Sequence, residues 1–161
     1  MQAYYLIMSN QKKMTMKKIY VLAIVVFCST FAVSAGESGE NALGVRFGYG
    51  GEVSYQRMLG SYNRLEIDAG WNSKYLGVAG IYHWVWDLSN LGPGFKWYAG
   101  IGAQVGIHES DFALGIAGDI GIEYNFTIPL QLSLDYRPTF YLIPGTDFSA
   151  SNAGFSIRYK F

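Results

Sequence analysis

A two-residue alternation of apolar and polar side chains is the feature that most constrains how this chain folds. It is clearest between residues 95 and 108, where the odd positions are Phe95, Trp97, Ala99, Ile101, Ala103, Val105 and Ile107, and the even positions are glycine or carry a polar group. Successive side chains of a β-strand point to opposite faces, so this period predicts a strand with one apolar and one polar face. No segment after residue 35 has a helical period or an apolar run long enough for a transmembrane helix.

The same alternation recurs along the rest of the chain. We expect strands in eight segments: 43–49, 51–59, 64–71, 75–86, 95–108, 114–124, 130–137 and 154–161. Glycine, proline, asparagine and aspartate gather between them, as turns require. The pattern predicts an all-β protein, an eight-stranded antiparallel up-and-down barrel with no room for a second domain.

Two of these segments are harder to assign to faces. Residues 75–86 are apolar on both faces, and we assign as outward Leu76, Val78, Tyr82, Trp84 and Trp86. In the segment 51–59, Arg57 is in phase with Val53 and Tyr55. Either Arg57 lies at a membrane interface, where its long side chain reaches water, or a bulge reverses the register.

The N-terminus has the pattern of a secretory signal peptide. Lys17 and Lys18 precede the apolar run 19–33, and small residues at positions 33–35 follow the pattern read by signal peptidase. We expect residues 1–35 to be a signal peptide, with a true start at Met14 or Met16, and residues 36–161 to form the barrel. An anchoring helix is the alternative, but the run is shorter than the about 20 residues that a spanning helix needs.

Cleavage there changes the composition of the mature protein. The single cysteine, Cys28, is lost with the signal, so neither disulfides nor cysteine metal sites are expected, and bulky Phe27 before it argues against lipidation. Four of the twelve basic residues also lie in that segment, which leaves eight basic against twelve acidic residues. This mildly acidic remainder has no basic stripe, so we expect no nucleic-acid partner.

The distribution of charge predicts which face meets lipid. Apart from Arg57, the charged residues within the strands fall on one face: Arg46, Glu52, Arg64, Glu66, Asp68, Lys96, Asp119, Glu123, Asp135, Arg137, Arg158 and Lys160. A lysine or arginine facing lipid at the bilayer midplane costs about 2–4 kcal/mol, so the apolar face is expected outside. Aromatic residues gather at both sets of strand ends, as they do in the girdles of membrane barrels.

The last strand carries a resemblance to a known family. Residues 155–161 alternate apolar and polar side chains and end in phenylalanine, with Ile157, Tyr159 and Phe161 in phase. The chain resembles small bacterial outer-membrane β-barrel proteins of the OmpA/OmpX type, and more closely their barrel-only versions. The resemblance implies a monomer in the outer membrane, in contact with its lipids and lipopolysaccharide. It also implies that the barrel-assembly machinery recognises the last strand. The expected external loops are shorter than is usual in that family.

Inside an eight-stranded barrel the side chains themselves fill the space. We expect the twelve inward charges to form a paired ionic network that leaves no open pore, and a non-enzymatic structural or surface-interaction role without cofactor or metal. One alternative is a lipid-modifying enzyme, acylating or deacylating lipid A, with His108 and Ser110 at the external rim. His83 is expected about 25 Å away, near the other end of the barrel. Another alternative is a soluble periplasmic ligand-binding barrel with its apolar face inward.

Overall fold

The computed structural model describes residues 41–48, 50–71, 75–108 and 111–161. They form ten strand segments: β1 (Asn41–Phe47), β2 (Gly51–Met58), β3 (Asn63–Trp71), β4 (Tyr75–Asp87), β5 (Phe95–His108), β6 (Asp111–Asn125), β7 (Leu130–Tyr136), β8 (Thr139–Ile143), β9 (Asp147–Ser149) and β10 (Ala153–Lys160). The expected signal peptide lies outside the described residues, as does Tyr49. Within the described part of the chain, no helix is long and apolar enough to cross a membrane.

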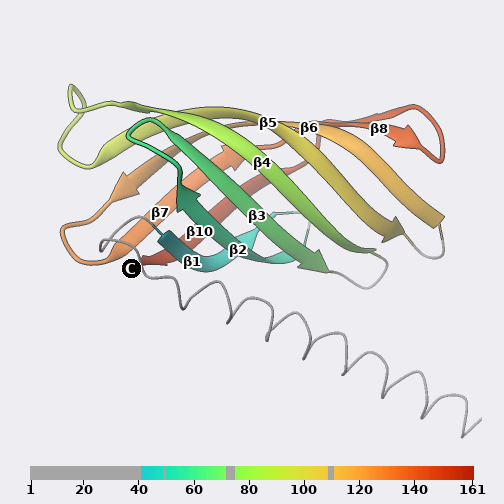
Figure 1. The fold of residues 1–161 in the computed structure, drawn as a ribbon, viewed down its shortest axis with the longest axis horizontal. Helices are drawn as coiled ribbons and strands as arrows, with labels where there is room; N and C mark the ends of the chain where they lie inside the picture. The colour runs from blue at the N-terminus through green and yellow to red at the C-terminus, as the bar shows by residue number, and fades with distance from the viewer. Residues whose placement is uncertain (1–40, 49, 72–74, 109–110) are drawn as a thin grey trace, which may run out of the picture. The chain divides into compact units, whose positions relative to one another are not determined.

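The sheet closes on itself. Each strand from β1 to β6 pairs antiparallel with the next, β7 and β8 both pair with β6, and β1 pairs with β10. Counting β7 with β8 and β9 with β10, eight spans form a closed antiparallel barrel (Figure 1), and the expectation from the sequence is confirmed. At the seam, the backbone N–H of Asn41 donates to the carbonyl of Phe161 at 3.1 Å, and the reverse bond measures 2.9 Å. We call this end of the barrel the terminal end.

The two faces of the barrel differ in polarity. In β3, Arg64, Glu66 and Asp68 are buried while the intervening Ile67 is 39% exposed. Most other spans show the same contrast, whereas β4 also turns Ala79, Ile81 and Val85 inward. The exposed apolar side chains include Leu43, Val45, Val78, Ile101, Val105, Ile116, Ile120, Leu134 and Ile157. The polar face therefore lies inside and the apolar face outside. A soluble barrel with its apolar face inward is thereby contradicted.

The structure resolves the two segments whose register the sequence left open. In β2, Ser54 and Gln56 are buried and Arg57 is exposed, with uninterrupted pairing to both neighbouring strands. There is no bulge, so Arg57 lies on the outer face, one residue before β2 ends. In β4 the exposed side chains include Leu76, Trp84 and Trp86, on the face assigned to them.

The seventh and eighth spans are longer than the sequence predicted. The seventh was expected to end at residue 137, but β8 continues the pairing with β6 beyond Pro138, and β9 lies in a segment expected to be a turn. Proline has no backbone N–H and so interrupts the ladder. Neighbouring bonds maintain the wall, because Gly118 N–H donates to the Pro138 carbonyl at 2.9 Å and Arg137 N–H donates to the Asn152 carbonyl at 2.8 Å.

The close approach of β4 and β5 requires a glycine at one position of β5. A Cβ atom at Gly102 would overlap the backbone carbonyl of Gly80 on β4, whereas a Cβ at Gly80 meets nothing within 4 Å. We therefore expect Gly102→Ala to lower the free energy of unfolding by about 1–3 kcal/mol, because the backbone has to move. Gly80→Ala is the matched control and should change it little. Urea unfolding of the folded barrel measures both, and equal effects would contradict this packing.

Candidate functional site: the polar interior

The interior holds the charged residues that the sequence placed on one face. Ten of the twelve have little exposed side chain, and Lys96 and Lys160 are half-buried near the terminal end. Four fully buried arginines dominate this interior: Arg46, Arg64, Arg137 and Arg158. Because a buried charge is tolerated only when it is paired, the partners of these guanidinium groups decide how the interior is built.

Arg137 is the centre of this network. It lies between β7 and β8, and its guanidinium nitrogens contact four carboxylates, at 2.7 Å from Asp68, 3.0 Å from Glu66, 3.3 Å from Asp119 and 3.5 Å from Glu52. These carboxylates come from β2, β3 and β6, so one side chain ties together strands on opposite sides of the barrel.

Two further arginines extend the network along the barrel. Arg158 donates to the hydroxyls of Ser54 and Ser133, each at 2.9 Å, and to Glu66 at 3.1 Å. Arg46 pairs with Asp135, and with Glu52 at 3.0 Å. The guanidinium of Arg46 passes so close to Gly154 that a Cβ there would lie about 2.5 Å from its carbon. The missing side chain at Gly154 makes room for this ion pair.

The fourth buried arginine, Arg64, lies next to His83. Arg64 pairs with Glu123, donates from Nε to His83 Nδ1 at 3.2 Å, and lies 4.3 Å above the centre of the Tyr98 ring. Arginine has only donors, so Nδ1 of His83 is an acceptor, and Nε2 carries the hydrogen that it donates to Asp119 at 3.0 Å. His83 is thereby held in one orientation as a member of the ionic network.

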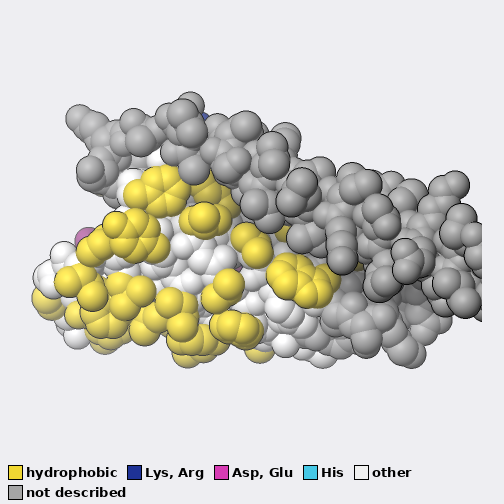
Figure 2. All heavy atoms as spheres, turned by 90° about the horizontal axis from the view of Figure 1, so that it is seen from below, with side chains coloured by type: hydrophobic (Ala, Val, Ile, Leu, Met, Phe, Trp, Pro, Cys, Tyr) yellow, Lys and Arg dark blue, Asp and Glu magenta, His cyan; other side chains and the backbone are white. Residues whose placement is uncertain are grey.

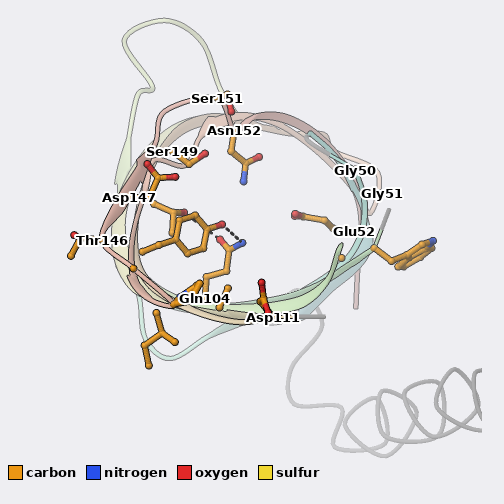
Figure 3. Close-up of a pocket in the computed structure, with 18 residues that line it drawn as sticks. Gly50, Gly51, Glu52, Gln104, Asp111, Thr146, Asp147, Ser149, Ser151 and Asn152 are labelled. Carbon is orange, nitrogen blue, oxygen red and sulfur yellow. Dashed lines mark hydrogen bonds between the residues drawn. The ribbon is translucent and has the colours of Figure 1, made fainter. Parts of the chain in front are cut away.

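The end of the barrel opposite the terminal end is hollow. A cavity of about 580 Å³, which we call the vestibule, is lined by residues from several strands, including Glu52, Gln104, Thr139, Tyr141 and Asn152. In Figure 3, Glu52, Gln104 and Asn152 point inward from different parts of the ring. The interior is therefore packed around Arg137 and Arg158 and open beyond Glu52.

Ser110 and the side chain of His108 lie outside the described residues, so the rim site stays an untested alternative. His83 lies inside the barrel on β4, four residues before that strand ends at Asp87, with Arg64 and Asp119 as partners. No group of three or more metal-ligating side chains occurs in the described part of the chain.

The residues expected to form the assembly signal lie on the outside of the last strand. Ile157 and Tyr159 are exposed, and the Phe161 ring stacks at 6.5 Å from that of Tyr159. The three side chains therefore share the outer face near the terminal end.

Several interior residues were not singled out from the sequence. His83, Tyr98, Gln56 and Gln131 are all buried with the ionic network. Each lies an even number of positions from a charged residue on its own strand. This spacing could have indicated that these side chains also point inward. Charge alone was too narrow a criterion, because uncharged donors and acceptors fill the space between the ion pairs.

The comparisons with known proteins bear on the fold of the chain. No protein-family model and no curated protein matches the sequence. Among solved structures, the chain is similar to the N-terminal β-barrel domain of Pseudomonas aeruginosa OprF, with a TM-score of 0.56 and 11% identity over 78% of this chain and 100% of that one. It also matches Neisserial surface protein A, with a TM-score of 0.49 and 14% identity over 77% of this chain and 95% of that one. The likeness to the OprF domain establishes the fold.

Because Arg137 is shared by four carboxylates, its replacement tests how much the ionic network contributes to stability. Arg137→Met leaves four carboxylates without their shared cation, so we expect the free energy of unfolding to fall by about 3–5 kcal/mol. Arg57→Met, on the exposed outer face, is the matched control and should have little effect. Urea unfolding of the refolded barrel measures both.

A double variant separates charge compensation from packing. If Arg137 acts by compensating buried carboxylates, adding Asp68→Asn to Arg137→Met restores part of the lost stability. Strictly additive losses in the double variant would mean that Arg137 acts through packing alone.

Proposed function

We propose that this chain is an integral β-barrel protein of a bacterial outer membrane, with a non-enzymatic role in envelope structure or surface interaction. Its exported form starts after residue 35, and its interior is closed at the centre by the ionic network. Outer-membrane lipids and lipopolysaccharide are its surroundings, and the barrel-assembly machinery inserts it by recognising the last strand.

The observation that carries this proposal is the inverted polarity of a closed barrel. Guanidinium and carboxylate groups occupy the interior, while the strands expose valine, leucine and isoleucine side chains. Figure 2 shows one face, where hydrophobic side chains gather over the described strands. A soluble monomer rarely exposes so large a continuous apolar surface, whereas lipid favours one, and closure leaves no backbone edge unpaired in lipid.

Aromatic contacts near the terminal end support an interface there. The rings of Trp86 and Trp97 stack with centroids 4.3 Å apart, and those of Phe95 and Tyr124 lie 4.7 Å apart. Tryptophan and tyrosine rings, each with one polar atom, favour the boundary between hydrocarbon and headgroups. The lone outward arginine, Arg57, also lies near this end, where its side chain can reach water.

Membrane fractionation with a gel of unheated and boiled samples tests the proposal. We expect the processed chain in the outer-membrane fraction, with a mobility that changes on boiling because the closed barrel unfolds. Mass measurement of the mature chain tests cleavage after Ala35. Finding the processed chain dissolved in the periplasm would refute the membrane assignment.

A charge on the outer face tests contact with lipid more directly. Ile101, in the middle of β5, is 54% exposed, and Ile128, in the β6–β7 turn, is 59% exposed. In lipid, Ile101→Arg should lower the free energy of unfolding by about 2–4 kcal/mol, whereas Ile128→Arg should have little effect. Urea unfolding in vesicles gives both values. Similar small effects at both positions would indicate that water, not lipid, surrounds the strands.

A further inference from the structure

We infer that the vestibule is a blind binding site for a small, neutral, hydroxyl-rich ligand of the size of a monosaccharide or disaccharide. The inference adds a ligand class to the proposed function and rests on it for one point, namely that the open end faces the outside of the cell. The binding chemistry itself depends only on the folded barrel.

The vestibule has the volume of a small-molecule site and is closed at its inner end. Its volume of about 580 Å³ falls within the range of about 300–1,000 Å³ that is usual for small-molecule sites. At its floor, Glu52 is bonded to Arg46 at 3.0 Å and to Arg137 at 3.5 Å, and both arginines are buried. These ion pairs close the inner end of the vestibule, so a ligand that enters from the open end cannot pass beyond them.

The floor and wall offer hydrogen-bonding groups from several strands. Asn152 accepts a bond from Arg46 through its Oδ1 at 3.2 Å, which leaves its NH₂ group to donate, and in Figure 3 that group points into the ring. On the wall, Gln104 accepts from Thr139 at 3.3 Å and donates to the Tyr141 hydroxyl at 3.4 Å. Amides and hydroxyls both donate and accept, as a ligand with several hydroxyl groups requires.

The charges of the vestibule favour a neutral ligand. No lysine or arginine is among its described lining residues, which disfavours a phosphate, sulfate or carboxylate ligand. The negative charge of Glu52 is neutralised by its ion pairs with Arg46 and Arg137, so Glu52 attracts a cationic ligand only weakly. The other two lining carboxylates, Asp111 and Asp147, are exposed, where solvent screens them. The Tyr141 ring adds an apolar surface of the kind that packs against the C–H face of a sugar.

The experiment uses the full mature barrel, refolded in micelles whose headgroups carry no sugar, and titrates it with glucose and maltose by calorimetry. Inorganic phosphate and spermidine serve as anionic and cationic comparison probes. We expect binding of at least one sugar, weakened about tenfold by Gln104→Leu and by Asn152→Leu, since each removes hydrogen-bonding groups from the site. Gln131→Leu, the same change in the packed interior near the terminal end, should leave sugar binding unchanged.

The boiling-dependent gel mobility confirms that each variant folds. Because Gln104 lies on β5 and Asn152 in the β9–β10 connection, the test does not depend on the folding of a single variant. No sugar binding by a folded barrel, tighter binding of phosphate or spermidine, or equal binding by all variants would each overturn the assignment. A folded barrel without sugar binding refutes only the vestibule site, whereas a chain absent from the outer membrane refutes the proposed function.

Discussion

Closure of the hydrogen-bonded sheet is the constraint on which the rest of this structure depends. The first and last strands pair with each other, and Phe161 and Asn41 complete the ladder at the terminal end. A closed sheet has no edge, and its alternating side chains must then divide between an inside and an outside. Once the apolar set faces outward, the twelve charged residues of the polar face are committed to the interior, whereas Arg57 lies outside.

That commitment explains the ionic network. Charges enclosed in a narrow barrel cannot reach bulk water, so each buried arginine pairs with at least one carboxylate from another strand. Arg137 does this most extensively, and the interruption of the wall at Pro138 is where its side chain enters. The network occupies the centre and extends toward the terminal end through Glu123 and Lys160. Beyond Glu52 the inward residues are smaller or uncharged, and the vestibule opens there. The interior thus contains a part occupied by buried ion pairs and a recess at one end.

The fold was largely predictable because a period of two is imposed by strand geometry itself. The places where prediction failed have physical reasons. Pro138 hides the continuation of the seventh span, because a residue without an N–H normally ends a strand, and here neighbouring backbone bonds bridge the gap. His83 and Tyr98 were left out of the expected ionic network because neither carries a formal charge, although both occupy inward-facing positions of their strands. The vestibule could not be predicted either, since its volume depends on how inward side chains from distant strands meet.

By itself the sequence determined that the chain forms strands, that it forms eight spans of them, and which side chains share a face. These properties are local, because alternation and turn residues act over about ten positions. The charge distribution also predicted which face turns inward, whereas the tertiary structure decided which arginine meets which carboxylate and where the interior is left open. Such outcomes require residues separated by up to about a hundred positions to come within bonding distance, as Arg46 and Asp135 do, and no local pattern encodes that meeting.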